Sequence, residues 1–225
     1  MTELDPDSLP VNFEEAWAYY RGLSPEDSAA RHIARDALLR QLLARTREAE
    51  HDKFHDSLTG LLNRDGITKF FDERRQQYRR ATDATKTDLM FMVDLDKFKS
   101  INDNRGHDAG DKTLVQVARI LELSFYRHGD AIARLGGDEF VGILLSGGRH
   151  EGQTVADRVR ANAETIASAD TSVAIPTFSI GLALIDYNKP FEESYRLVDQ
   201  AMYAAKHAGG DQVYISSPGV IELPE

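Results

Sequence analysis

Two glycines followed by two carboxylates constrain this chain more than any other feature. They lie in the stretch Gly136–Phe140, which reads Gly-Gly-Asp-Glu-Phe. Apolar residues flank it, Ala131–Ala133 before and Phe140–Leu145 after. This pattern predicts a β-hairpin whose turn uses glycine to reach positive φ and to let a ligand approach the backbone. Carboxylates at such a tip suit a metal ion and a phosphate better than a core.

A second acidic pair follows an uninterrupted apolar run. Leu89–Val93 is typical of a strand buried on both faces, and Asp94 and Asp96 come directly after it. Aspartates often start turns, which is the simpler interpretation of this pair. If the strand lies beside the hairpin, however, Asp94 comes near Asp138, and two such carboxylates form a hard-oxygen site for Mg²⁺ or Mn²⁺. The hairpin acids favour the metal site.

The segment from residue 98 to residue 111 is dense in polar groups. Lys99 could neutralise a phosphate, and Asn102 offers both a donor and an acceptor. Asp111 offers paired acceptors that suit the adjacent N–H donors of the guanine Watson–Crick edge, a pair that adenine lacks. His107 has a simpler role as a hydrogen bonder of the loop, so we assign it no catalytic role.

Composition narrows the class of partner. The chain has 225 residues and a formal net charge of −10, which argues against nucleic acid as a partner. A small phosphorylated ligand stays open if metal ions supply positive charge. There is no cysteine, so we expect neither disulfides nor a cysteine zinc site, and a cytoplasmic location by default. The N-terminal residues lack a signal-peptide pattern and no run spans a bilayer, so we expect no membrane insertion.

Residues 1–54 are predicted to form a helical N-terminal extension for dimerisation or regulation. The spacing of Phe13, Ala16, Trp17 and Tyr20 predicts a short amphipathic helix. Ser24 is expected to cap a second helix with Pro25 at its first position and with Glu26 and Asp27 favouring its dipole. The apolar stripe of that helix consists of Ile33, Ala34, Ala37, Leu38 and Leu42. Two interpretations stay open: the extension packs on its own domain, or it pairs two subunits or passes a signal.

Residues 55–217 alternate between helical and strand patterns, and residues 218–225 are expected to be a C-terminal tail. We predict an α/β sandwich in which helices flank a mixed central sheet, rather than a doubly wound parallel fold. The predicted helices are 65–80, 111–125, 154–167 and 191–207, and the predicted strands besides the hairpin are 89–93, 178–185 and 213–215.

Ordered motifs between about residue 52 and about residue 215 carry a family resemblance. They are Asp56–Arg64, Asp94–Lys99, Asn102-Asp103, Gly106-His107, Gly110-Asp111, Gly136–Phe140 and Ala201–Lys206. Together they resemble the GGDEF family of diguanylate cyclases. The resemblance implies a fold similar to nucleotidyl cyclases and polymerase palms. It also implies condensation of two GTP into cyclic di-GMP with release of two pyrophosphates.

The resemblance also implies roles for individual residues. Asp94 and Asp138 would bind the metal, two Mg²⁺ or Mn²⁺ ions per half-site, with help from the Leu95 carbonyl. Asp138 or Glu139 would assist deprotonation of the ribose 3′-OH. The implied substrate-binding residues are Lys99 and Lys206 on the triphosphate, Asn102 and Asp111 on guanine, Gly136 and Gly137 at the turn, and Phe98. Each domain would bind one GTP, so a homodimer would be part of the mechanism.

Arg127 and Asp130 precede the hairpin in an R-x-x-D arrangement, with Arg158 on the following predicted helix. By chemistry alone this is a common surface ion pair, but its register resembles the inhibitory site at which the family's product feeds back. One departure stands at Gly210, where family members commonly carry an arginine, and we expect weaker GTP binding from its loss. A non-catalytic nucleotide receptor and a cyclase with relaxed base choice are the alternative functions.

Overall fold

The computed structural model describes residues 13–24, 26, 28–80, 87–145, 148–217 and 220–222. The chain forms two compact units, Met1–Lys53 and Phe54–Glu225. Among the described residues, no helix is both long and apolar enough to cross a bilayer.

The first unit consists of two helices, α1 (Phe13–Gly22) and α2 (Ser28–Phe54, whose last residue falls in the second unit). The predicted cap is displaced, because Ser24 Oγ accepts a hydrogen bond from the Glu26 amide at 3.3 Å ahead of α2. The predicted positions Pro25 and Asp27 lie outside the described residues. Among the described residues of the unit, the buried apolar ones are mostly small, namely Ala16, Ala30, Ala34 and Leu38. The predicted stripe is therefore only partly buried.

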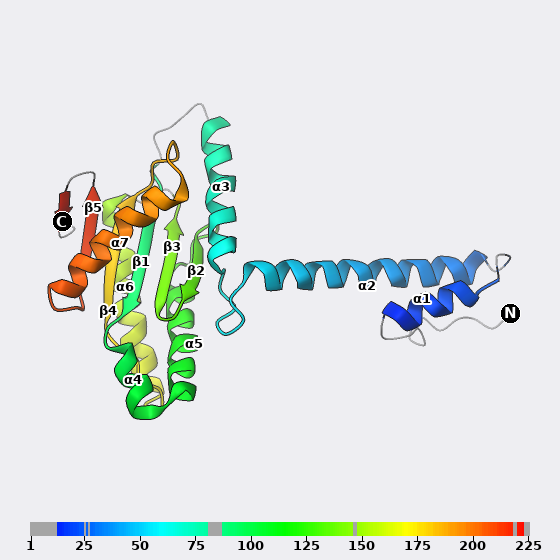
Figure 1. Ribbon diagram of the computed structural model, residues 1–225, viewed down its shortest axis with the longest axis horizontal. Coiled ribbons are helices and arrows are strands. Elements are labelled where there is room, and N and C mark those ends of the chain that lie inside the picture. The colour runs from blue at the N-terminus through cyan, green and yellow to red at the C-terminus, as the bar shows by residue number, and fades with distance from the viewer. Residues whose placement is uncertain are drawn as a thin grey trace. The chain divides into compact units, whose positions relative to one another are not determined.

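The second unit is built on a six-stranded sheet in the order β2-β3-β1-β4-β5-β6 (Figure 1). The strands are β1 (Leu89–Leu95), β2 (Ala131–Gly136), β3 (Glu139–Leu144), β4 (Phe178–Leu184), β5 (Val213–Ser217) and β6 (Val220–Glu222). β1 is antiparallel to both of its neighbours, β3 and β4, whereas β4 and β5 run parallel. The predicted mixed sheet and α/β class are confirmed.

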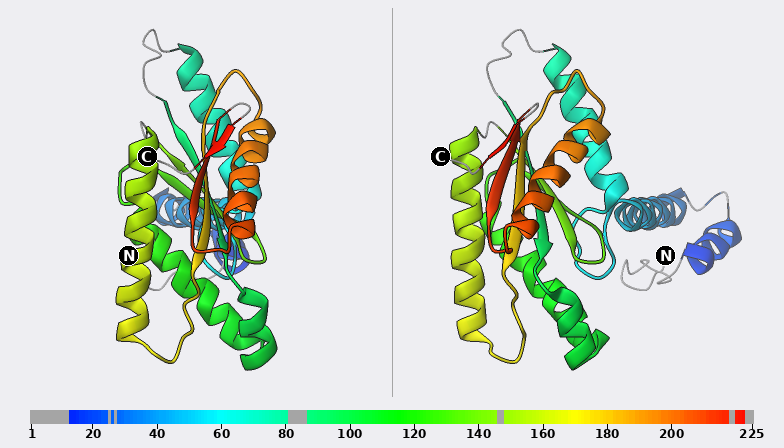
Figure 2. Two further views of the ribbon diagram at one scale, coloured as in Figure 1. Left: turned by 90° about the vertical axis from the view of Figure 1, so that its left-hand side faces the viewer. Right: turned by 60° about the vertical axis from the view of Figure 1, so that its left-hand side comes forward.

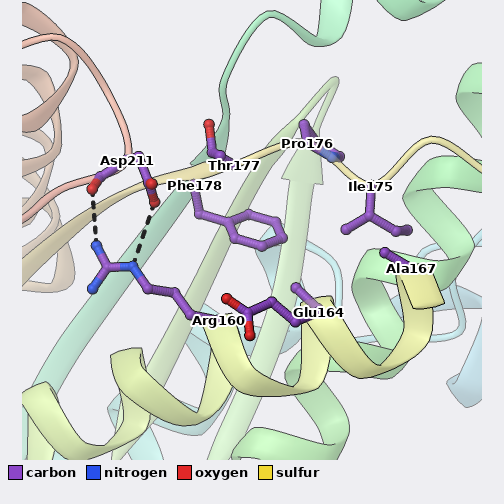
Figure 3. A pocket seen from close by; sticks show the side chains of 9 residues that line it. Arg160, Glu164, Ala167, Ile175, Pro176, Thr177, Phe178 and Asp211 are labelled. Carbon is purple, nitrogen blue, oxygen red and sulfur yellow. Dashed lines mark hydrogen bonds and ion pairs between the residues drawn. The ribbon is translucent and has the colours of Figure 1, made fainter.

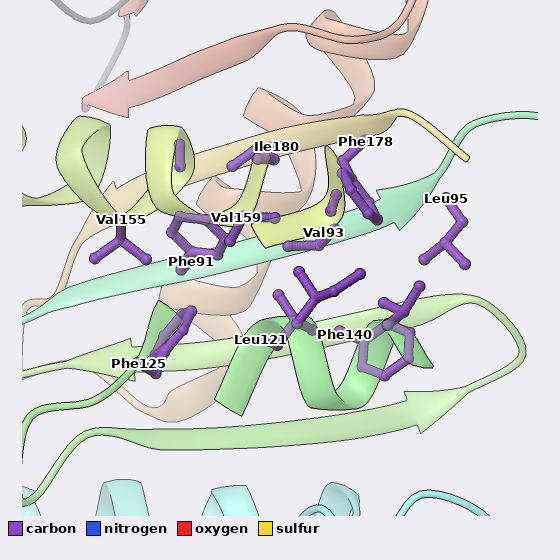
Figure 4. Close-up of a cluster of buried hydrophobic side chains, with 14 of the residues drawn as sticks. Phe91, Val93, Leu95, Leu121, Phe125, Phe140, Val155, Val159, Phe178 and Ile180 are labelled. Atoms are coloured by element: carbon purple, nitrogen blue, oxygen red, sulfur yellow. The ribbon is translucent and has the colours of Figure 1, made fainter. Parts of the chain in front are cut away.

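Helices cover both faces of this sheet (Figure 2). On one face lie α4 (Phe98–Arg105), α5 (His107–Ser124) and α6 (Arg149–Ala169), which bury a large apolar cluster around Phe91 and Leu121 (Figure 4). On the other face lie α3 (Arg64–Arg80) and α7 (Phe191–His207), which cover a second cluster around Met90 and Met92. Every residue of β1 is buried, as expected for the central strand.

The alternation of side chains along β1 decides where its acidic end points. Phe91, Val93 and Leu95 belong to the cluster under α5 and α6, and Met90 and Met92 belong to the cluster under α7. Because successive strand side chains point to opposite faces, Asp94 falls on the α7 face. The fully buried central strand thus places the Asp94 carboxylate on the face of the sheet that α7 covers.

The structure adds elements that the sequence patterns did not predict. The polar segment after β1 forms a helix of its own, α4, and Gly106 with a φ of 83° joins it to α5, which begins at His107 rather than residue 111. The helix α6 begins at Arg149, ahead of the predicted residue 154. Residues 220–222 of the predicted tail form β6, antiparallel to β5. The polar composition of residues 98–105 hid the helix because only Phe98 on it is fully buried.

Candidate functional site

The hairpin tip has the conformation that its glycines predict. Gly136 and Gly137 join β2 to β3 with φ angles of 139° and 54°, values that a residue with a side chain rarely adopts. A β-carbon at either position would meet no atom within 4 Å, so the surface beside the turn is open. Asp138 follows at the tip, and Asp138 and Glu139 are half-buried.

Asp94 lies directly opposite Glu139 in the antiparallel register of β1 and β3. It is only 4% exposed, and Lys206 of α7 places its Nζ 2.6 Å from Asp94 Oδ1. Burial raises the pKa of Asp94 to about 6; the hydrogen bond from Lys206 opposes this rise, whereas the charges of Asp138 and Glu139 add to it. The ammonium of Lys206 stabilises the ionised form of this buried carboxylate beside its acidic neighbours.

The donor set at this edge fits a hard divalent cation. The carboxylates of β1 and of the hairpin tip lie close enough to interact, since the charges of Asp138 and Glu139 both raise the pKa of Asp94. Across the described residues, no cluster of three or more His, Asp or Glu side chains is arranged to hold a metal by itself. A metal bound here would therefore need oxygens from a ligand as well, as Mg²⁺ in phosphate-handling sites does.

Asp96 has a structural role in the turn after β1 and does not face the site. Its carboxylate accepts hydrogen bonds from Thr177 Oγ1 at 2.8 Å, Ser179 Oγ at 2.7 Å and the Asp211 amide at 2.8 Å. The next residue, Lys97, has a φ of 59°. These contacts fix the end of β1 against β4 and the loop after α7, and so hold the backbone of Asp94 in place.

The loop contact of Asp96 gives a physical reason for Gly210. This glycine has a φ of 78°, and a β-carbon on it would lie 2.9 Å from Asp96 Oδ1. An arginine at position 210 would therefore be strained and would disturb the Asp96 contacts. A Gly210→Arg variant would perturb the loop as well as add a charge, so it is an unsuitable test of the expected weaker GTP binding, which stays a prediction.

The predicted base-reading residues lie on α4 and α5, which pack closely. A β-carbon at Gly110 would overlap Asn102 Oδ1 and come within 3.3 Å of Phe98 Cζ, so glycine at 110 permits the present position of the Asn102 amide. Phe98 is 8% exposed and belongs to the core cluster. Lys99 and Asp111 are exposed. Phe98 thus packs in the core, and the substrate-binding roles of Phe98, Lys99, Asn102 and Asp111 stay predictions.

Arg134 is a residue of the site that sequence reasoning missed. It donates two hydrogen bonds to the Gly137 carbonyl, at 3.0 and 2.8 Å, and two to the Asp56 carboxylate, at 3.1 Å each. Burial raises the pKa of Asp56, but hydrogen bonds from Thr59 and Arg134 outweigh it and hold that pKa below its ordinary value. The hairpin tip is therefore tied to the turn at Asp56–Gly60. The turn residues Asp56 and Thr59 were the available signal.

The residues of the R-x-x-D arrangement come together on another part of the unit. Arg127 pairs with Glu151 of α6 at 2.9 Å, and Arg158 lies 3.8 Å from the same carboxylate. Asp130 Oδ1 accepts a hydrogen bond from the Leu145 amide at 2.9 Å, and burial raises the pKa of Asp130. Glu151 was not predicted, and the inhibitory role of Arg127, Asp130 and Arg158 stays a prediction.

A cavity of about 190 Å³ lies between α6 and the segment that leads into β4 (Figure 3). Its floor is largely apolar, and at its rim Arg160 donates a hydrogen bond to the Asp211 carbonyl at 3.1 Å. Thr177 and Asp211 line the cavity and also donate to Asp96. The cavity therefore borders the loop that fixes the end of β1.

Together these features define an α/β domain of the nucleotidyl-cyclase and polymerase-palm type, with an acidic sheet edge beside a glycine turn. Residues 53–212 match the family model described as "Diguanylate cyclase, GGDEF domain". The chain belongs to the GGDEF family of diguanylate cyclases.

Among the relatives, diguanylate cyclase DgcM of Escherichia coli K12 is 36% identical over 171 residues, which cover 74% of this chain and 39% of the relative. Diguanylate cyclase DosC of the same strain is 33% identical over 182 residues, covering 78% and 37%. The chain thus spans about two fifths of the length of these relatives.

Solved structures agree with the fold. The coiled coil and GGDEF domain of DgcB from Caulobacter crescentus, in complex with c-di-GMP, superposes with a TM-score of 0.70 at 23% identity, covering 84% of this chain and 100% of that one. Diguanylate cyclase SiaD of Pseudomonas aeruginosa, in complex with its activator SiaC, gives a TM-score of 0.68 at 27% identity, covering 91% and 77%.

The Arg134 bridge leads to a prediction about the hairpin tip. Arg134→Lys keeps the charge but cannot bond the Asp56 carboxylate and the Gly137 carbonyl with one planar fork. We expect amide hydrogen exchange in the peptide covering residues 134–140 to become about tenfold faster, because local opening loses roughly one net hydrogen bond. Mass spectrometry of exchange measures this, with Arg119→Lys on the exposed side of α5 as the matched control. Unchanged exchange at the tip would contradict the bridging role.

Proposed function

We propose that this protein is an active diguanylate cyclase that condenses two GTP into cyclic di-GMP and releases two pyrophosphates. The observation that carries the proposal is the pairing of Asp94 with Glu139 at the sheet edge, where Lys206 neutralises a carboxylate that burial and acidic neighbours disfavour. Clustered charges of this kind do not help a hydrophobic core to pack, whereas a site that binds cations and phosphates needs them.

The nucleotide is held by residues around this edge. The open surface at Gly136 and Gly137 lets the triphosphate approach the backbone. Lys206 and Lys99 neutralise phosphate charge, with Lys206 leaving Asp94 as the nucleotide binds. Asn102 and Asp111 read guanine, since a carboxylate accepts from the adjacent N–H donors of its edge and adenine does not present that pair.

Asp94 and Asp138 would hold Mg²⁺ or Mn²⁺, with the Leu95 carbonyl contributing. Bound there, two such ions would offset the triphosphate charge and lower the pKa of the ribose 3′-OH. The residues of the chain do the positioning: the Asp96 contacts fix Asp94, and the Arg134 bridge fixes the tip that carries Asp138 and Glu139.

The chemical step is a pair of in-line substitutions. Asp138 or Glu139 accepts the proton of a 3′-OH, and that oxygen attacks the α-phosphorus of the facing GTP. The new 3′–5′ phosphodiester bond forms as the bond to pyrophosphate breaks, and a second, reciprocal attack closes the ring. Lys206 and Lys99 stabilise the leaving charge. Each domain binds one GTP, so two copies must face each other.

We propose that the first unit, within residues 1–54, brings these copies together by pairing with the same unit of a second chain. Large apolar side chains of its helices are exposed, including Trp17 at 46%, Leu39 and Leu42 at 50% and Leu43 at 58%. A helical pair of this size buries too little surface to be stable alone, so we expect a second copy of the unit to cover its exposed apolar side chains. The DgcB structure likewise joins a coiled coil to a GGDEF domain.

The group formed by Arg127, Asp130 and Arg158 would bind the product and inhibit the enzyme. Arginine pairs well with phosphate and with the O6/N7 edge of guanine, while the Asp130 carboxylate accepts from guanine N–H groups. The DgcB structures contain bound c-di-GMP, which supports product recognition in the family.

GTP as substrate and the absence of cysteine favour a cytoplasmic location, and the acidic charge argues against nucleic acid as a partner.

The activity is tested by incubating the full chain with Mg²⁺ and GTP, ATP or both, and resolving the products by chromatography. We expect cyclic di-GMP from GTP and no mixed dinucleotide. Asp138→Ala should reduce turnover by at least about 100-fold while leaving the fold intact, because metal binding and proton transfer both lose a group. Asp72→Ala, at an exposed position of α3, is the matched control. Absence of product from the unmodified chain would favour a nucleotide receptor, and full activity of Asp138→Ala would contradict the metal assignment.

The dimer is tested by placing charges on the apolar surface of the first unit. Leu39→Glu combined with Leu43→Glu should convert the chain to a monomer at micromolar concentration and lower turnover at least about tenfold, because like charges would face each other across the pair. Light scattering gives the mass and the GTP assay gives the rate. Leu123→Glu, 52% exposed on α5, is the control. A double variant with unaltered mass and rate would remove the dimerisation role of this unit.

A further inference from the structure

The R-x-x-D group contains a fourth charged residue, Glu151, in the first turn of α6. Its Oε2 lies 2.9 Å from the Arg127 guanidinium, and its Oε1 lies 3.8 Å from that of Arg158. Its side chain is 19% exposed, less than those of Arg127 at 43% and Arg158 at 25%. One carboxylate of the chain thus lies between the two arginines that a bound anion would need.

The two arginines differ in their freedom to move. Arg158 donates from Nε to the Ser124 carbonyl at 3.1 Å, and its guanidinium lies 4.5 Å from the centre of the Tyr126 ring. Two contacts therefore fix its plane. Arg127 is the more exposed of the pair, and its guanidinium donates to Glu151. A ligand can recruit Arg127 by rotation of one side chain, but only by taking it from Glu151.

Three buried polar atoms in this group make no hydrogen bond in the described chain: Asp130 Oδ2, and Glu151 Oε1 and an Nη of Arg158, which contact each other only as a 3.8 Å ion pair. Buried polar groups are normally satisfied, so a cluster of three points to a missing partner. Asp130 Oδ1 already accepts a hydrogen bond from the Leu145 amide, which leaves Oδ2 to accept one from a ligand. The Arg158 Nη donates. A ligand with both an N–H donor and an anionic or carbonyl acceptor would satisfy them.

We propose that Glu151 is an internal competitor for this site, occupying the arginines in the ligand-free state and setting the product concentration at which inhibition begins. This inference rests on the proposed function. The ligand is the cyclic dinucleotide, whose phosphate would replace the Glu151 carboxylate on Arg127 and whose guanine edge would donate to Asp130. Because Glu151 must yield an ion pair and then lie near a phosphate, its charge weakens product binding.

A purely structural role would leave product affinity unchanged. An acidic residue in the first turn of a helix is favourable through the helix dipole alone. Stability and affinity therefore have to be measured separately. Glu151→Gln keeps the shape and removes the charge. Glu151→Ser removes both the charge and the side chain's reach to the two arginines.

The experiment measures the Kd of cyclic di-GMP for the full chain by calorimetry, together with inhibition of GTP turnover. We expect Glu151→Gln and Glu151→Ser to lower this Kd and the inhibitory concentration by about three- to tenfold, the effect of removing a partly buried competing charge. The initial rate without product should stay unchanged. Glu164→Gln, exposed on the same helix, should behave like the unmodified chain. Arg127→Ala should abolish binding with or without Glu151.

An unchanged or higher Kd in both folded Glu151 variants would overturn the proposal, whatever their melting temperatures. Turnover of GTP without any product binding would overturn it too, by removing the inhibitory site. Absence of turnover with product still bound would instead contradict the proposed catalysis and leave the competition measurable by calorimetry.

Discussion

The ion pair between Asp94 and Lys206 is the interaction on which the site depends. It places a carboxylate at the end of a fully buried strand, 2.6 Å from an ammonium on the helix that covers it. Removing the cation would leave a buried charge beside two other acids, which is costly. The ammonium of Lys206 therefore stabilises the ionised form of Asp94 in the ligand-free fold. In the proposed mechanism, a divalent metal bound with the nucleotide would take over this neutralising role.

Two further contacts hold the groups that surround this pair. Asp96 fixes the strand end through three hydrogen bonds, and Arg134 connects the hairpin tip to the turn at Asp56. Preorganisation of this kind places reacting groups without cost at the moment of reaction. At the second group, Ser124 and Tyr126 likewise fix Arg158, whereas Arg127 contacts Glu151.

The sequence predicted the parts of the fold that have strong periodicity or special backbone needs. The buried strand before Asp94, the hairpin with its two glycines and α7 all lie where the patterns placed them. The helix α4 was missed because its polar residues resemble a loop. Glu151 and Arg134 were missed because their partners, Arg127 and Asp56, are far apart in the chain and meet only through tertiary packing. The spacing of residues along the sequence does not reveal such tertiary pairs. It likewise does not reveal that Gly210 lies against Asp96.

A crystal structure of the full chain with Mg²⁺ and a non-hydrolysable GTP analogue would test the roles of Asp94 and Lys206 most directly. We expect an Asp94 oxygen at about 2.1 Å from a metal ion. We also expect Lys206 Nζ to have moved from Asp94 to a phosphate oxygen. Lys206 still paired with Asp94 while the nucleotide is bound elsewhere would contradict these roles.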